Sequence, residues 1–330
     1  MSRFSKMSWA WPLAALGLIF LANALFNPEF FSLELRDGRI YGSLIDVLNR
    51  GAPVGLLAIG MSLVIATGGI DLSVGAVIAI TGAVCANLLV SGVDAVSLVV
   101  VLGLLTGLAA GLINGSLVAY LGIQPIVATL VLMVAGRGIA QLINAGQIVT
   151  FHHDGFAFVG VGAVFGLPTP VIVLLVTLVA LLVLVRVTAL GLFIESVGGN
   201  PRASHNAGIN VKAVKLAVYA VAGVCSALAG IVITADIQGA DANNAGLWLE
   251  LDAILAVVIG GASLAGGRFS LPLSVIGALI IQALSTSILM SGVPPTYNLL
   301  IKALVIVVIL LIQSPALKQQ VGRLAARVAR

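Results

Sequence analysis

The chain has 330 residues, of which 60% are hydrophobic and 8% are charged, and its mean hydropathy is +1.20. A soluble protein of this length needs many more charged residues to cover its surface, so the composition excludes a soluble globular protein. The apolar segments run for ~17–25 residues without polar alternation, which favours membrane-spanning helices over a β-barrel. The net charge of +4 comes from scattered basic residues, and we therefore expect no nucleic-acid binding.

We predict an all-α polytopic membrane protein that forms a single transmembrane domain over residues 1–330. The first apolar segment, residues 9–26, is followed by Asn-Pro-Glu-Phe-Phe and not by a small-residue cleavage site, so we interpret it as a retained span. Ten spans are expected, at residues 10–26, 52–68, 72–92, 96–121, 125–145, 168–187, 211–235, 250–267, 271–291 and 297–315.

The distribution of basic and acidic residues among the predicted loops indicates how the spans are oriented in the membrane. An even number of spans puts both termini on one side, and both terminal segments are basic without an acid, so the positive-inside rule predicts cytoplasmic termini and a basic cytoplasmic tail at residues 316–330. The predicted inner loops agree, because Glu195 is their only acid and their basic residues are Arg186, Arg202, Lys212, Lys215 and Arg268. The predicted outer loops hold most of the acids of the chain, Asp46 among them, against the basic residues Arg36, Arg39 and Arg50.

Residues 66–75 interrupt the apolar pattern with two glycines, Asp71 and Ser73. A charge in or near the bilayer is costly, so Asp71 needs a partner, a helix N-terminus or water. Because glycines let the backbone turn, Asp71 or Ser73 could cap the next helix, which would make this a structural break. A direct role in a translocation path or its gate is the alternative.

Cys85 and Cys225 both fall inside predicted spans, where thiols act as small hydrophobic groups, so no disulfide is expected.

Arg137 lies between two glycines in the fifth predicted span, roughly 20 Å from its cytoplasmic end at 1.5 Å per residue. A guanidinium there could donate to the hydroxyls of a sugar or to backbone carbonyls of a neighbouring span. Both interpretations stay open for Arg137, and Asn114, Gln124 and Asn144 are polar groups of the same ambiguous kind, which could simply bridge helices. Asn114, Arg137 and Gln141 therefore join Asp71 and Ser73 as candidates for a translocation path.

The sequence His152-His153-Asp154 resembles a metal site, but no further ligand is placed near it, so we expect an exposed loop and no bound metal.

The chain is basic between Arg186 and Lys215, and residues 188–210 within this stretch contain a short helix with both ends marked. Asn200 suits the N-cap, Pro201 suits the first turn, and Gly208 suits a left-handed stop. Two helical turns are too short for a domain, so we expect another protein to dock here.

The stretch from residue 236 to residue 252 is predicted to face outward and carries carboxylates, amides and an interfacial tryptophan. Such groups can hold a polyhydroxylated ligand or a partner protein, although a solvated acidic loop with a membrane-anchoring Trp248 explains them as well. The candidate contacts are Asp241, Asn243, Asn244, Trp248, Glu250 and Asp252. Lys302, near the outer end of the last span, is expected to extend its amine to the membrane interface.

Several motifs are absent from the sequence. No glycine is followed by lysine, so there is no P-loop, and there is no His-Glu-x-x-His zinc motif or nucleophile elbow. We expect no covalent catalysis in this chain and no nucleotide site; if transport is driven by ATP, the ATPase is another polypeptide.

Residues 66–75, 123–130, 188–211 and 251–268 resemble the ribose-type sugar permeases of bacterial ABC importers. The resemblance extends over residues 45–312, and residues 146–151 and 239–252 most resemble the permeases that import galactofuranose. It implies a type II ABC importer permease in the bacterial inner membrane that moves a galactofuranose-, galactose- or ribose-like monosaccharide by alternating access.

The resemblance also implies partners. They are a second permease subunit, identical or different, a periplasmic sugar-binding protein, and cytoplasmic ATPases that hold ATP and magnesium. Membrane lipid surrounds the spans. The capped segment matches the position of the family's coupling helix, which implies ATPase contact by Asn200, Pro201, Arg202, Ala203, His205, Ala207 and Gly208.

Two other functions are kept as alternatives. A secondary transporter of a small polar solute would use Asp71 as its proton or sodium site. An intramembrane enzyme is disfavoured, because the sequence shows no nucleophile–base pair and no set of metal ligands.

Overall fold

The computed structural model describes residues 9–36 and 39–313, and α-helices make up most of this part of the chain. The α-helices are α2 (Ala10–Phe26), α3 (Ser43–Ala66), α4 (Val74–Val90), α5 (Val96–Ala119), α6 (Pro125–Ile143), α7 (Asp154–Val161), α8 (Thr169–Val187), α9 (Leu190–Gly199), α10 (Pro201–Asn206), α11 (Val211–Ile237), α12 (Leu249–Ile259), α13 (Leu271–Met290) and α14 (Asn298–Gln313). Two 3-10 turns, η1 (Pro28–Phe31) and η2 (Pro295–Tyr297), precede α3 and α14. The all-α prediction is confirmed.

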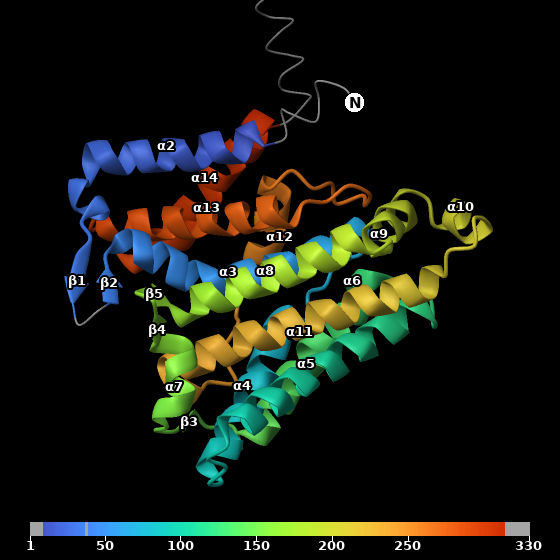
Figure 1. Ribbon diagram of the computed structural model, residues 1–330, viewed down its shortest axis with the longest axis horizontal. Coiled ribbons are helices and arrows are strands. Elements are labelled where there is room, and N and C mark those ends of the chain that lie inside the picture. Colours follow the sequence, from blue (N-terminus) through green and yellow to red (C-terminus); the bar gives the residue numbers. More distant parts are fainter. Residues whose placement is uncertain (1–8, 37–38, 314–330) are drawn as a thin grey trace, which may run out of the picture.

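Within the described residues, three short two-stranded antiparallel sheets form in the loops between the helices. Strand β1 (Glu34–Arg36) pairs with β2 (Arg39–Tyr41), β3 (Val149–Thr150) with β6 (Gly239–Ala240), and β4 (Ala163–Val164) with β5 (Leu167–Pro168). In the second pair Val149 lies opposite Ala240, which ties the segment after α6 to the segment after α11. The strands β1 and β2 mark one end of the molecule, and α10 marks the other (Figure 1).

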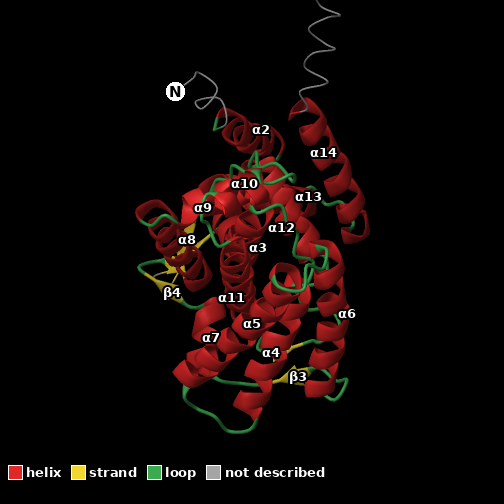
Figure 2. Ribbon diagram, turned by 90° about the vertical axis from the view of Figure 1, so that its right-hand side faces the viewer, coloured by secondary structure: helices red, strands yellow, loops and turns green. Residues whose placement is uncertain are grey.

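Helix α3 is the centre of the fold. Every residue from 51 to 66 is buried, and α8, α11, α12 and α13 all pack against it. Figure 2 views the helices nearly end-on and shows α3 among them. A helix that is apolar on all sides is stable only where other helices cover it, which fits this position. Glycines bring the helices close, because a β-carbon on Gly60 would lie 2.9 Å from the Cα of Ala222 in α11.

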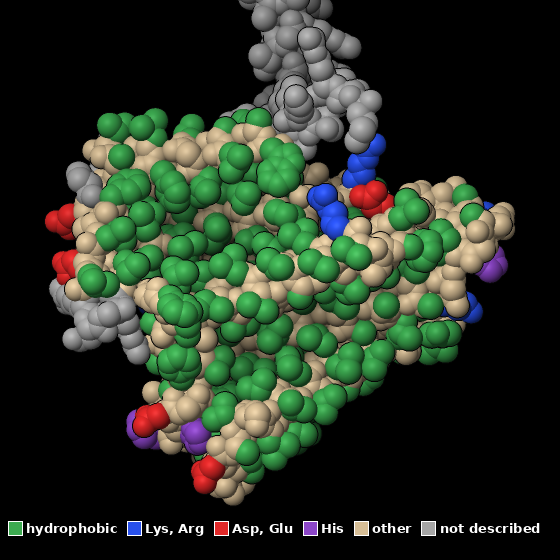
Figure 3. Space-filling view, viewed as in Figure 1, with side chains coloured by type: hydrophobic (Ala, Val, Ile, Leu, Met, Phe, Trp, Pro, Cys, Tyr) green, Lys and Arg blue, Asp and Glu red, His purple; other side chains and the backbone are tan. Residues whose placement is uncertain are grey.

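Hydrophobic side chains cover the long sides of the visible face, while the charged side chains gather toward its two ends (Figure 3). Six helices are long and apolar enough to cross a membrane, namely α3, α5, α6, α8, α11 and α13. Shorter apolar helices include α2, α4, α9 and α14 over most of their lengths. The chain is therefore a multi-pass membrane protein. The predicted basic ends, Arg3 with Lys6 and residues 316–330, lie outside the described residues.

Two of the predicted spans differ from the structure. Helix α3 begins at Ser43, nine residues before the predicted start at 52, so Asp46 and Arg50 belong to the helix and not to a loop. The predicted span 250–267 is wrong in extent, because α12 ends at Ile259 and has 11 residues. At 1.5 Å per residue it covers about 16 Å, roughly half of a ~30 Å hydrocarbon core. The helix stops where Gly261 adopts a φ of +90°.

The first turns of α12 and α4 lie side by side in the interior of the protein. Helix α4 packs on the part of α11 nearest to α7, because Ile78 meets Gly230 and Gly82 meets Thr234. A β-carbon on Gly75 would lie 2.5 Å from the carbonyl oxygen of Gly246, just before α12. The N-termini of two short helices, α4 and α12, therefore meet inside the molecule, and both present the positive ends of their dipoles there.

Candidate translocation path and coupling segment

Asp71, Ser73 and Asn114 form one buried hydrogen-bonded cluster. Asp71 Oδ1 accepts from the Ser73 N–H at 2.9 Å and from its hydroxyl at 2.6 Å. The Asn114 amide donates to Ser73 Oγ at 2.8 Å, and the three residues are 0–2% exposed. Ser73 precedes α4 but its side chain does not cap the helix. These bonds attach the connection between α3 and α4 to α5. Such an attachment is what we expect if residues 66–75 are a structural break between two helices.

Arg137, Gln141 and Asn144 lie on successive turns at one face of α6 and bind the segment that follows α11. The Arg137 guanidinium donates to the carbonyls of Ala242 at 3.2 Å and Ala245 at 2.5 Å. Gln141 donates to the Asn243 side chain at 2.7 Å, and Asn144 donates to the Ala240 carbonyl at 2.9 Å. Of the two interpretations of Arg137, the structure shows the contact with backbone carbonyls.

The connection between β6 and α12 carries four of the predicted contact residues, namely Asp241, Asn243, Asn244 and Trp248. Asp241 accepts from the side chain of Asn244 at 2.7 Å and from the backbone N–H groups of Asn243 and Asn244 at 2.9 and 3.2 Å. These bonds, the Asn244 side chain first, hold the pKa of Asp241 below its ordinary value. Trp248 is exposed, has a φ of +69° and directly precedes α12.

Glu250 and Asp252 do not lie on that loop, which corrects their predicted placement. Both belong to the first turn of α12, and Glu250 is 6% exposed beside Gly75. Asp252 accepts from Lys302 of α14 at 2.6 Å, with the two side chains 17% and 12% exposed. The expectation that Lys302 extends to the interface is therefore wrong, because a carboxylate inside the protein neutralises its charge.

The predicted capped helix is confirmed as α10. The Asn200 side chain accepts from the Ala203 N–H at 3.0 Å, Pro201 occupies the first turn, and Gly208 has a φ of +87°. All six helical residues are exposed except Ser204. Helix α9, which the sequence interpretation missed, leads into α10 and carries it to the far end of the molecule (Figure 1).

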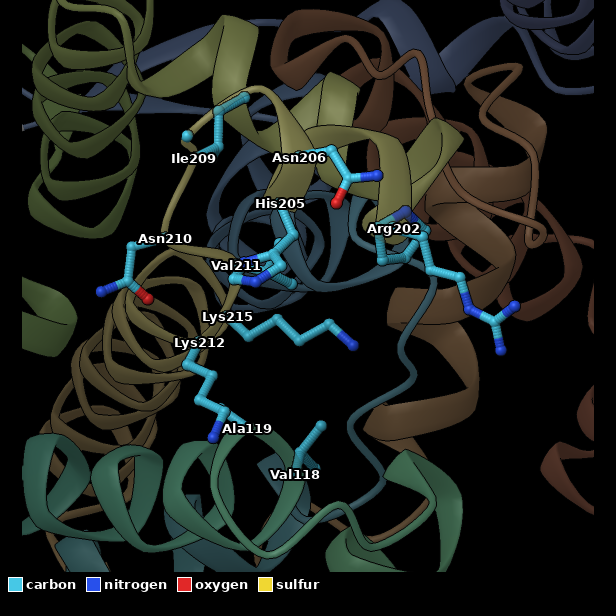
Figure 4. Close-up of a pocket in the computed structure, with 12 residues that line it drawn as sticks. Val118, Ala119, Arg202, His205, Asn206, Ile209, Asn210, Val211, Lys212 and Lys215 are labelled. Atoms are coloured by element: carbon cyan, nitrogen blue, oxygen red, sulfur yellow. The ribbon is translucent and has the colours of Figure 1, made fainter.

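A cavity of about 790 Å³ lies between α10, the start of α11 and the end of α5. Figure 4 shows Arg202, His205, Lys212 and Lys215 around this space. Its lining includes no acidic residue among the described ones, and Lys212 Nζ lies 5.7 Å from the centroid of the Tyr120 ring. The cavity therefore presents positive charge beside the exposed helix.

The histidine pair has structural roles. His153 Nδ1 accepts from the Phe156 N–H at 3.2 Å and caps α7, and His152 contacts Gln238 at 3.1 Å. Within the described part of the chain, no group of three or more His, Cys, Asp or Glu residues is placed to hold a metal ion.

Comparison with known proteins agrees with this architecture. The family model described as "Branched-chain amino acid transport system / permease component" matches residues 43–310. The chain is 58% identical to the galactofuranose transporter permease protein YtfT of Escherichia coli K12, over 94% of this chain and 92% of that protein. It is 38% identical to the fructose import permease protein FruF of Bifidobacterium longum NCC 2705, over 92% of this chain and 87% of the relative.

It is likewise 38% identical to the ribose import permease protein RbsC of Escherichia coli K12, over 92% of each chain. Each of these names describes a transport permease and none describes an enzyme, and no solved structure matches the chain. The match of one family model to most of the chain, with three permeases aligned over nearly its whole length, shows that the protein belongs to the branched-chain amino acid transport system / permease component family.

Proposed function

We propose that this chain is the permease subunit of an ABC importer that moves a monosaccharide into the cytoplasm, with galactofuranose as the first candidate. The observation that carries the proposal is the 58% identity over 94% of the chain to a galactofuranose permease, together with sugar permeases at 38% identity. The complex would contain a second permease subunit, ATPases that bind ATP and magnesium, and a periplasmic sugar-binding protein, in the bacterial inner membrane. Both termini of the chain would be cytoplasmic.

The coupling role of α10 is supported by its geometry. The helix is capped at both ends, stands clear of the spans and borders a basic cavity. An ATPase surface with complementary acidic groups would be attracted to Arg202, Lys212 and Lys215. ATP binding would displace α10, and that displacement would expose a central path first to one side of the membrane and then to the other.

Uptake into vesicles tests the function. The chain would be co-expressed with its ATPase, binding protein and any second permease, purified and reconstituted, and labelled D-galactose and D-ribose would be the probes. We expect uptake that requires ATP on the side of α10 and persists when ionophores remove proton and sodium gradients. Uptake that follows an ion gradient without ATP would instead support the secondary transporter with Asp71 as its ion site.

Glutamate substitutions at Ala203 and Ala207 test the docking role, because both side chains are exposed on α10 or at its end. Either variant should lose co-purification with the ATPase and lose ATP-driven uptake, while its elution in detergent stays that of the folded protein. Ala189→Glu is the matched control, because Ala189 is exposed just before α9 and outside α10. Wild-type uptake by both α10 variants would refute the docking role.

A further inference from the structure

We infer that the permease itself holds a monosaccharide in a cleft between Arg50 of α3 and Asp236 of α11. This inference rests on the proposed transport of sugars and goes beyond it, because it names a site in this chain. The cleft is a cavity of about 220 Å³ whose polar lining residues are Asn49, Arg50, Asp236, Asp252 and Gln282. Four helices, α3, α11, α12 and α13, contribute these side chains.

The cleft opens toward the end of the molecule that carries β1 and β2. A second cavity of about 280 Å³ shares Asn49 and Gly160 with the first and reaches Tyr41 of β2 and Asp46. In the proposed orientation this end faces the periplasm, so a sugar released there could enter. The floor is the first turn of α12, with Leu249 and Asp252, and it exists because α12 begins inside the molecule.

Gln282 donates to Thr286 at 3.4 Å and Asp252 pairs with Lys302, whereas the side chains of the other three polar lining residues have no hydrogen bond within the described part of the chain. Within the described residues, Arg50 and Asp236 form no salt bridge of 4 Å or less with each other or with another group, although their charges interact. The Oδ1 atom of Asn49 is buried without a hydrogen-bond partner among the described residues. An unpaired buried acceptor destabilises the empty cleft, and the hydroxyl of a bound sugar would satisfy it.

These groups suit a polyol. A sugar hydroxyl both donates and accepts, the Arg50 guanidinium supplies donors, the Asp236 carboxylate supplies acceptors, and the amides of Asn49 and Gln282 supply both. Pro53, Val54 and Leu249 give the cleft an apolar wall for the C–H face of a sugar ring. Sites for drug-sized ligands measure ≈ 300–1,000 Å³, so the smaller cavity here suits a solute of about one ring.

The charge balance favours a neutral ligand over an ion. Lys302 neutralises Asp252 at 2.6 Å, and Arg50 opposes Asp236 across the cleft. The cleft therefore has no excess charge that would attract an anion or retain a cation. A neutral sugar placed between them would accept a charge-assisted hydrogen bond from Arg50 and donate one to Asp236.

Uptake kinetics of the reconstituted complex test the site, with D-galactose and D-ribose as probes at a saturating concentration of ATP. Asp236→Asn and Arg50→Gln should each raise the KM for the transported sugar about tenfold, the equivalent of one lost hydrogen bond to a charged group. Arg50→Lys should recover only part of the loss, because a lysine keeps the charge without the planar fork. Asp94→Asn is the matched control, an exposed acid outside the cleft, and its KM should not change.

Basal ATPase activity and co-purification with the ATPase report whether each variant is folded. An unchanged KM in both Asp236→Asn and Arg50→Gln, with wild-type transport intact, would overturn the site and leave the proposed function standing. An increase as large in Asp94→Asn would overturn it as well, because the effect would then not belong to the cleft. Wild-type complex that transports no sugar at all would overturn the function and the site together.

Discussion

The backbone of Gly198 in α9 packs directly against the carbonyl oxygen of Ala66, the last residue of α3. The Gly267 N–H donates to the same oxygen at 2.9 Å. Gly198 lies two residues before Asn200, which caps α10, and Ala66 lies five residues before Asp71. No side chain lies between these two backbones. A displacement of α10 would therefore be transmitted through this backbone contact to α3 and to the cluster of Asp71, Ser73 and Asn114.

Gly198→Ala should disrupt this contact, because a β-carbon there would overlap the Ala66 carbonyl. Overpacking costs about 1–3 kcal/mol when the neighbours are able to move, and both neighbours here are backbone. We expect ATP-driven uptake to fall about tenfold or more, as measured in reconstituted vesicles. Gly199→Ala is the control, since its β-carbon would meet nothing within 4 Å. Equal uptake by the two variants would show that the contact transmits nothing.

Lys302→Met should destabilise the folded permease, because it leaves the Asp252 carboxylate without its cation in a largely buried position. Removing one partner of a buried ion pair costs about 3–5 kcal/mol. Thermal unfolding in detergent should show a lowered Tm, and the double variant with Asp252→Leu should recover part of the loss. Lys212→Met, at an exposed lysine, should change the Tm little. A double variant as unstable as Lys302→Met would contradict the pairing as the cause.

Arg137→Met should loosen the segment from β6 to α12, because the Ala242 and Ala245 carbonyls lose their donor. A hydrogen bond to a charged group contributes about 1.5–3 kcal/mol, so a thiol placed at residue 244 should react with a water-soluble maleimide about tenfold faster. The experiment uses Asn244→Cys in a background in which both native cysteines are serine. Gln141→Ala removes an exposed neutral contact and should have a smaller effect. Identical rates in all backgrounds would refute the anchoring role.

Neither native thiol should react with a membrane-impermeant maleimide in the folded protein. Cys85 and Cys225 are free, and their exposed fractions are 0% and 1%. Intact-protein mass spectrometry should find no adduct before denaturation and two adducts after treatment with SDS. One adduct on the folded protein would show that α4 or α11 opens on the labelling timescale.

The class of protein and the capped helix α10 could be predicted from local sequence. Hydropathy over twenty residues reports whether a segment can cross a membrane, and the caps of α10 depend on Asn200, Pro201 and Gly208 within one short stretch. The predicted bounds of eight helices agree with the structure to within about two residues, because their apolar lengths are uninterrupted; these are α2, α4, α5, α6, α8, α11, α13 and α14. Such signals require no knowledge of what packs beside them.

The tertiary structure decided what the polar residues do. Asp252 lies 50 residues from Lys302, Arg137 lies 105 residues from Ala242, and Asp71 lies 43 residues from Asn114. The sequence supplied each of these groups with its chemistry, but a polar side chain in an apolar setting bonds to whichever partner the packing brings within reach. For the same reason hydropathy alone extended α12 to residue 267, whereas its start beside α4 and its stop at Gly261 became visible only once the helices were assembled.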